Sequence, residues 1–570
     1  MSAPEEPQLP PPSPAAAEES RSKRGRRVIA GALIAVLVAV GVTGGILAFR
    51  LIRGSADALV TMAPSDSAVY VNVNLDPSAA QKLAIDGLLG KFPGLAGSQR
   101  DSTINDWLDK AFKDTGLTHS DVRPWLGAQL SVVVSASGLT THAGSSPPAA
   151  AVLAATTDDA KALAAFDKFR RGSVGSAMTW STTSHGGVSV ISGQTGSDRS
   201  SRVVWAIVSH AAVLGSTVEM VDEVIDTAQG KHAALPSVSD YKTVDSQLPG
   251  DRISFVYVDL PTVLKAVAGP FDAVPGLQAQ LKGLRGIGGA TQVSSTGVTE
   301  RVVEDYETSK LTADQRASLA ERAHVNDVLS YVPQHAYGFL AVTGIQHAVR
   351  ALVDEVGGLL GGGLDQTLQG LGVTGPNGIV GHLTGDAGIE VDAGQGSTIP
   401  GGALLLDTDS TTAAQMFLQS LATQLCTGTA ACDTSQETTD TYKGVTVRSL
   451  PLDVESAGVE PSWAVNNGLI ILGSSPAEVK AMLDAHSGTA AITSAPNFRS
   501  VTRQISTSNT GMFYLDVHAV VSAVRGVLPP DIRATFDEKV APYVNPFRAI
   551  GTSTQNAGDH VTATLFLVIG

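Results

Sequence analysis

The chain is poor in cysteine and in aromatic residues. Its 570 residues include two cysteines and only 5% aromatic side chains. A structural zinc site needs four Cys or His ligands at short spacings, and two cysteines without a nearby histidine do not supply them. Cys426 and Cys432 are separated by five residues, and we predict that an oxidising compartment joins them as a disulfide. Two free buried thiols are the alternative.

The motifs that carry most known chemistry are also missing. The chain has no Gly-x-Ser-x-Gly elbow, no phosphate-binding loop with Gly-Lys-Ser/Thr and no His-Glu-x-x-His helix. Its twelve histidines are scattered singly, and the run from Asp407 to Thr411 begins like a calcium loop without the glycine and glutamate that such a loop needs. We therefore expect no cofactor, no metal and no enzymatic activity. A hydrolase with an unfamiliar site is the remaining alternative.

Positive charge is scarce. The chain has 39 Lys and Arg against 54 Asp and Glu, a net charge of −15. An acidic protein is a poor partner for nucleic acid, whose phosphates need basic patches, so we expect no nucleic-acid binding. Charge alone also gives it little attraction to anionic lipid headgroups. The hydrophobic share of 43% is high enough for packed cores and excludes global disorder.

One long apolar run contrasts with this composition, from Val28 to Phe49. A helix of that length spans ~33 Å, enough for a hydrocarbon core of ~30 Å. Five of the seven residues before it, Arg21 to Arg27, are basic, and basic residues stay on the cytoplasmic side. We predict a disordered Pro/Ala-rich cytoplasmic tail at 1–27 and a transmembrane helix at 28–52 in contact with the lipid bilayer. The rest would lie outside the plasma membrane. A signal peptide cleaved near Ala56-Asp57-Ala58 is the alternative.

The remainder of the chain contains an internal duplication. Trp205–Asp226 aligns without a gap with Trp463–Asp484, and Trp, Ala, Leu, Gly, Ser, Val and Asp fall at the same offsets. Similar segments flank both stretches in the same order, which indicates one repeat at 57–305 and a second at 326–570, joined by a polar helical linker at 306–325.

Each repeat contains short strands joined by Gly/Ser turns, with few helices between them. Ser216 and Ser475 each lie three residues before a glutamate, which is the capping-box spacing, and we predict that they begin amphipathic helices. The predicted fold class is therefore α+β, with one N-terminal transmembrane helix followed by two tandem homologous α+β repeats of mainly antiparallel sheet.

Two Gly/Leu segments, 85–97 and 356–375, occupy corresponding places after the first strand of each repeat. Apolar side chains on such segments are typical of a groove for an apolar ligand or of a surface that touches lipid. Ordinary packing in core helices is the alternative. The predicted contact residues are Leu88, Leu89, Phe92, Leu359, Leu360 and Leu364.

The strand MAPSDSAVYVNV at 62–73 follows the short tail and the single apolar run. Together with the Trp-Ala…Leu-Gly-Ser and Tyr-x-Asp segments, this pattern resembles the actinobacterial membrane proteins grouped as domain-of-unknown-function family 3352. The resemblance covers most of residues 57–570. It implies an envelope location and no known activity, and it supplies no catalytic residues.

These features predict a single-pass envelope protein that is not an enzyme. Its expected role is that of an interaction or scaffold module with a protein partner in the envelope. Binding of a lipid or of another apolar envelope ligand is the alternative.

Overall fold

A computed structural model describes residues 57–97, 99–136, 149–195, 202–267, 283–347, 368–375, 378–394, 400–426, 434–452 and 460–570, with the single residues 139, 281 and 349. The chain divides into two compact units. Unit 1 consists of Met1–Lys82, Gly97–Lys242 and Gly250–Ala268, and unit 2 of Leu83–Ala96, Thr243–Pro249 and Gly269–Gly570.

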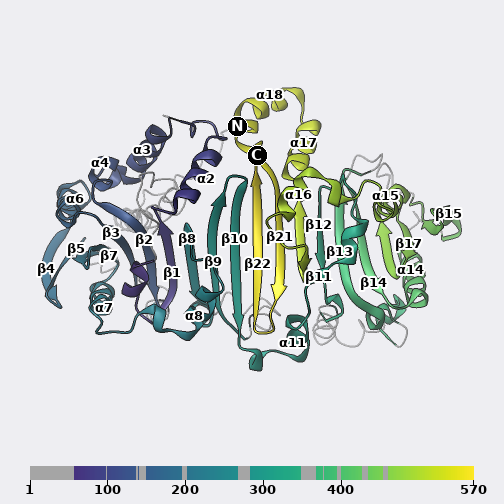
Figure 1. The fold of residues 1–570 in the computed structure, drawn as a ribbon, viewed down its shortest axis with the longest axis horizontal. Coiled ribbons are helices and arrows are strands. Elements are labelled where there is room, and N and C mark those ends of the chain that lie inside the picture. Colours follow the sequence, from purple (N-terminus) through teal and green to yellow (C-terminus); the bar gives the residue numbers. More distant parts are fainter. Residues whose placement is uncertain are drawn as a thin grey trace, which may run out of the picture. The chain divides into compact units, whose positions relative to one another are not determined.

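The strands of unit 1 pair antiparallel in the order β4, β5, β6, β7, β3, β2, β1, β8 (Figure 1). Buried and more exposed residues alternate in the middle of β1, as the period of two in a strand requires. The bounds are β1 Ser67–Asn74, β2 Leu126–Ser135, β3 Ala150–Thr156, β4 Thr179–His185, β5 Val188–Gln194, β6 Arg202–Val208, β7 Ala211–Gly215 and β8 Ser254–Asp259.

Helices accompany this sheet, and α6 and α7 pack on it. Thr217 caps α7 by accepting a hydrogen bond from the Met220 N–H at 3.1 Å. The prediction that Ser216 caps this helix was wrong, because its hydroxyl instead accepts from the Ala150 N–H at 3.0 Å. The helices are α2 Ala79–Leu89, α3 Gln99–Phe112, α4 His119–Val122, α6 Asp159–Arg171, α7 Val218–Ala228, α8 Ser239–Ser246 and α9 Leu260–Val267; the division between the units falls within α2 and α8.

The strands of unit 2 pair antiparallel in the order β9, β10, β22, β21, β20, β12, β13, β14, β18, β17, β16, β15. A separate short pair joins β11 to β19. The bounds are β9 Leu284–Ser294, β10 Gly297–Tyr306, β11 His324–Val325, β12 Gly338–Val342, β13 Leu383–Asp392, β14 Gly401–Thr408, β15 Thr438–Tyr442, β16 Val445–Ser449, β17 Ser462–Asn466, β18 Leu469–Gly473, β19 Ser508–Asn509, β20 Gly511–Leu515, β21 Phe547–Asn556 and β22 His560–Ile569.

Helices pack on both faces of this sheet. Ser475 caps α15, as predicted, by accepting from the Glu478 N–H at 3.2 Å. The α helices are α11 Ala313–Leu319, α14 Thr411–Cys426, α15 Pro476–His486, α16 Pro496–Thr502, α17 Val517–Val527, α18 Pro530–Lys539 and α19 Ala541–Val544, and the short 3-10 turn η6 is Asp327–Tyr331.

The two strand orders correspond element by element. In unit 1, β4 to β7 are followed across the sheet by β3, β2, β1 and β8, and in unit 2, β15 to β18 are followed by β14, β13, β12 and β20. Trp205 lies in β6 and Trp463 in the corresponding β17. Each tryptophan strand leads through a second strand into the capped helix α7 or α15.

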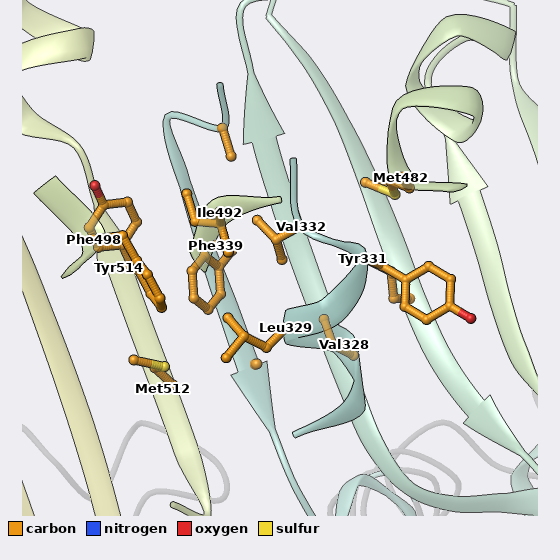
Figure 2. Packing of buried hydrophobic residues seen from close by; sticks show 14 of the residues in the cluster. Val328, Leu329, Tyr331, Val332, Phe339, Met482, Ile492, Phe498, Met512 and Tyr514 are labelled. Atoms are coloured by element: carbon orange, nitrogen blue, oxygen red, sulfur yellow. The ribbon is translucent and has the colours of Figure 1, made fainter. Parts of the chain in front are cut away.

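One face of the unit 2 sheet carries a continuous apolar core (Figure 2). The rings of Phe498 and Tyr514 meet edge to face with centroids 5.2 Å apart, and Phe339 lies 5.9 Å from both. The turn η6 adds Val328 and Leu329, which are buried on the same side. Each such side chain contributes about 1.5–3 kcal/mol by leaving water, so this face fixes where α15 and α16 lie.

The predicted fold class was wrong. The structure is built on extended, mostly antiparallel sheet with twenty strands and accompanying helices, and the predicted repeats do not keep separate sheets. Strand β10, from the first predicted repeat, pairs with β22, from the second, between Gly297↔Val568 and Asp305↔His560. An alternating sequence predicts that a strand exists, but it does not specify which open edge that strand will join.

The structure also gives no support for the transmembrane helix in that prediction. Among the residues described from Asp57 onward, no helix is long and apolar enough to cross a membrane. The longest of them, α14, has 16 residues and spans ~24 Å, less than a hydrocarbon core of ~30 Å. Residues 1–27 and 28–52 lie outside the described residues, and the plasma-membrane location stays a prediction.

Candidate functional site

The predicted apolar contact residues divide into a described and an undescribed group. Leu88 is buried in α2, Leu89 is half-buried, and the half-buried Phe92 packs its ring against Phe547 of β21 with centroids 5.4 Å apart. Leu88 is therefore part of the interior, and Phe92 packs on a strand of unit 2. Leu359, Leu360 and Leu364 lie outside the described residues.

The predicted disulfide falls at the end of α14. Cys426 is the last residue of that helix and is disulfide-bonded. Cys432 lies outside the described residues, so the pairing of Cys426 with Cys432 stays a prediction.

A group of large apolar side chains is exposed in the middle of the unit 2 sheet. Leu340 of β12 is 44% exposed, and Ile389 and Val391 of β13 are 52% and 42% exposed. Leu340 pairs directly with Ile389 and with Phe513 of β20, so these three side chains share one face. Gly338 pairs with both Val391 and Leu515, which adds these two to the same face. We define the apolar strip as Leu340, Ile389, Val391, Phe513 and Leu515.

The corresponding strands of unit 1 carry the same arrangement. Val71 of β1 pairs directly with Val132 of β2 and with Val256 of β8. Val256 is 36% exposed, and Val71 and Val132 are half-buried. Aliphatic residues therefore occupy this face in both units, which indicates a duplicated property of the surface.

The opposite face of β13 buries acidic side chains. Glu390 and Asp392 are 1% and 0% exposed, and they meet Glu478, which is 0% exposed in the first turn of α15. His335, in the segment before β12, places its Nε2 3.0 Å from Asp392 Oδ2. The Gly394 N–H donates to Asp392 Oδ1 at 2.7 Å, and the carboxyl group of Glu478 lies beside that of Asp392. We define the acid cluster as His335, Glu390, Asp392 and Glu478.

Burial, neighbouring charges and hydrogen bonds shift the pKa values of these groups in different directions. Burial, together with the charges of Asp392 and Glu478, raises the pKa of Glu390 to about 9. Burial alone would raise the pKa of Asp392, but hydrogen bonds from His335, from the Gly394 N–H and from Glu478 lower it below its ordinary value. The hydrogen bond to Asp392 raises the pKa of His335. At neutral pH the cluster therefore holds a neutral Glu390 beside an ionised Asp392.

A glycine makes room for this cluster. Gly401 of β14 pairs with Asp392, and a Cβ at this position would lie 2.7 Å from Asp392 Oδ1 and 2.8 Å from Glu478 Oε1. Gly401→Ala is expected to lower the free energy of unfolding by about 1–3 kcal/mol, because the buried carboxyl groups must move. Urea denaturation of the two proteins measures the difference.

The control is Gly87→Ala in α2, where a Cβ would meet no atom within 4 Å. That change is expected to raise the free energy of unfolding by about 0.5–1 kcal/mol, because alanine favours helix. Equal stability of Gly401→Ala and the wild type would show that the acid cluster is not packed as described.

Two cations lie close together near the end of β22. Lys91 Nζ donates to the Ile569 carbonyl oxygen at 2.5 Å, and Arg548 Nη1 lies 3.2 Å from His518 Nδ1 at the start of α17. Burial and the charge of Arg548 lower the pKa of Lys91. Neither cation forms an ion pair with an acidic side chain of the described residues. We call Lys91 and Arg548 the cation pair; it can attract an anionic group.

The cation pair lies close to the apolar strip in the sheet register. Leu515 of the strip pairs with Ile550 of β21, and Arg548 is two residues before Ile550 in the same strand. Phe92, one of the predicted contact residues, is the neighbour of Lys91 and packs on Phe547, the neighbour of Arg548. The two cations were not predicted, because single Lys and Arg residues far apart in sequence give no pattern.

Within the described ranges, no group of three or more His, Cys, Asp or Glu side chains is arranged to hold a metal ion.

Comparisons with known proteins identify a family and no function. No curated protein matches the chain. Crystal forms IV, I and III of TP0453 are similar to parts of it, at 11%, 9% and 11% identity and TM-scores of 0.23, 0.22 and 0.23. These structures cover 44%, 46% and 46% of this chain and 81%, 85% and 85% of their own; at such scores the likeness carries no argument. Residues 28–564 match the family described as Protein of unknown function (DUF3352), and the protein belongs to this family.

Proposed function

We propose that this protein is a non-catalytic binding module that holds an anionic amphiphile, with its hydrocarbon chain on the apolar strip. The observation that carries the proposal is the exposure of Leu340, Ile389 and Val391, each more than two-fifths exposed at the centre of a sheet. Contiguous apolar surface of this kind is unusual on a face exposed to water and is typical of binding sites.

The composition of the strip favours a hydrocarbon chain over a protein partner. Energetically dominant residues of protein interfaces are enriched in Trp, Tyr and Arg. The strip has none of these, and apart from Phe513 it is aliphatic. Its side chains offer no hydrogen-bonding group, so they select for apolar contact area alone.

Charge supports an anionic head group on the ligand. The cation pair, Lys91 and Arg548, lies near the end of the strip in an otherwise acidic chain, and its charges meet no acidic side chain among the described residues. A carboxylate or phosphate group placed there would accept charge-assisted hydrogen bonds from both. Binding would also relieve the mutual repulsion of the two cations.

A scaffold role with a protein partner is the second candidate. Among the described strands, β15 pairs only with β16 and β4 only with β5. Open strand edges present unpaired backbone groups to which another chain can add a strand. This observation favours a protein partner at the edges and does not involve the strip.

A charge placed on the strip tests the first candidate. Ile389→Glu is expected to weaken binding of a fluorescent long-chain fatty acid to the full-length protein at least about tenfold. The reason is that the new carboxylate must lose its hydration when the hydrocarbon chain of the fatty acid contacts it. Fluorescence titration measures the affinity. Folding should be little affected, because Ile389 is 52% exposed.

The matched control is Leu163→Glu on α6 of unit 1, where the leucine is 43% exposed and lies outside the strip. It should bind the fatty acid as the wild type does. Equal affinities for all three proteins, or no binding by any of them, would contradict the amphiphile proposal. Capture of a protein that depends on β15 and not on Ile389 would support the scaffold role instead.

A further inference from the structure

We propose that the acid cluster makes the docking of α15 on unit 2 dependent on pH, so that α15 loosens when the cluster loses its protons. The cluster joins α15 to β13, because Glu478 belongs to the helix and Glu390 and Asp392 to the strand. This inference is independent of the proposed ligand and uses the opposite face of β13.

The geometry favours bound protons. Asp392 Oδ1 and Glu478 Oε1 lie 2.7 and 2.8 Å from the same point, the position that a Cβ at Gly401 would take. Two buried carboxylate charges this close repel each other, so protonation of one of them is favoured. Both oxygens of Glu390 are buried without a hydrogen-bond partner in the described part of the chain. An ionised Glu390 would place an unsolvated charge beside two further carboxyl groups, which is strongly unfavourable.

The charged and titratable side chains that the structure describes around this cluster come from several elements. On β13, Asp386 lies four residues before Glu390, and its Oδ1 is 2.9 Å from His324 Nε2. The segment before β12 contributes His335, and β14 and β18 contribute the glycines Gly401 and Gly473. His335 is the cation that the structure places against the cluster, with its Nε2 3.0 Å from Asp392 Oδ2. Other charged side chains of α15 form ion pairs elsewhere, Lys480 with Asp440 and Asp484 with Lys443.

Unit 1 shows that the fold does not require acids at these positions. Val133 pairs with Tyr70 as Glu390 pairs with Phe339, in corresponding strands. Met220 follows Trp205 by the same interval as Glu478 follows Trp463. Val133 and Met220 are 0% and 1% exposed. Unit 1 thus packs apolar side chains where unit 2 packs two carboxyl groups.

The sign of the pH dependence follows from bound protons. Glu390 ordinarily titrates near 4.5, and burial raises its pKa to about 9 in the folded protein. Between these values the folded state binds more protons than the unfolded state, so stability falls as pH rises. The raised pKa of His335 acts in the same direction, because its contribution is complete below its ordinary 6.5 and is lost as pH passes the raised value. Asp392 acts oppositely and only in acid, where stability is lost as pH falls through its lowered pKa.

Hydrogen exchange of the full-length protein tests the proposal. The protection of α15 amides is divided by that of α7 amides at the same pH, which cancels the intrinsic pH dependence of exchange. This ratio is expected to fall at least about tenfold, the equivalent of one pKa unit, between roughly pH 5.5 and pH 9. In Glu390→Gln, which keeps the shape and removes the titrating group, the ratio should fall clearly less.

A second variant keeps the test decisive if Glu390→Gln fails to fold. Glu390→Val combined with Glu478→Met installs the residues of unit 1, and its ratio should stay constant with pH. Glu219→Gln, at an exposed glutamate in the first turn of α7, is the control and should behave as the wild type. A constant ratio in the wild type, or an unchanged fall in the variants that fold, would overturn the proposal.

Discussion

Replacing Trp205 by alanine is expected to lower the free energy of unfolding by about 3–5 kcal/mol. Trp205 is 1% exposed in β6, and its ring stacks on Phe166 of α6 with centroids 4.1 Å apart and 25° between the planes. The change removes the largest fully buried side chain of unit 1 and leaves a cavity between sheet and helix. Urea denaturation followed by circular dichroism measures the loss.

Two further variants separate packing from other effects. The Trp205 Nε1 group has no hydrogen-bond partner among the described residues, so Trp205→Phe forfeits no bond and should cost less than about 1.5 kcal/mol. Leu163→Ala, at a side chain 43% exposed on α6, should cost under about 1 kcal/mol. A loss below 1 kcal/mol for Trp205→Ala would contradict the assignment of this tryptophan to the core.

Gly297→Ala is expected to cost about 3 kcal/mol by disturbing the pairing of β10 with β22. Gly297 has a φ of +159°, and a Cβ there would overlap the Leu567 carbonyl oxygen. Backbone in this region is almost restricted to glycine, and forcing another residue into it costs about 1–3 kcal/mol before the overlap is counted. Denaturation of the variant beside the wild type measures the effect.

The control for this change is Gly526→Ala in α17, where a Cβ would meet no atom within 4 Å. It is expected to be neutral or to stabilise by up to about 1 kcal/mol, because alanine is the better helix former. If Gly297→Ala were as stable as Gly526→Ala, the pairing of β10 with β22 would not have the geometry described.

The sequence predicted the elements with clear local signals. The helices α7 and α15 were predicted from a Ser-x-x-Glu spacing and an amphipathic stripe, within the segments that the duplication aligns. The cap at Ser475 is confirmed, whereas Thr217 takes that role in α7 because the hydroxyl of Ser216 is already engaged by β3. Which of the two neighbouring hydroxyl groups caps the helix depends on β3, a strand far away in sequence. Local residue spacing therefore cannot predict it.

The apolar strip and the acid cluster could not be predicted, because β13 buries its acidic side chains and exposes its aliphatic ones. Its residues alternate between apolar and acidic, which normally places Ile389 and Val391 inside and Glu390 and Asp392 outside. The structure buries the acids beneath α15 and exposes the aliphatic residues. A period of two defines two faces without saying which one a helix will cover. The partner of β10 was missed for a similar reason, since pairing across the repeats depends on which edge is open.

The most direct test of the central claim is to find where the amphiphile binds. A fatty acid with a photoactivatable diazirine near the end of its chain is crosslinked to the full-length protein, and the labelled peptides are mapped by mass spectrometry. We predict labels on β12, β13 and β20, around Leu340, Ile389 and Phe513, and loss of these labels in Ile389→Glu. Labelling confined to other segments, or labelling of the strip that Ile389→Glu leaves unchanged, would contradict the account.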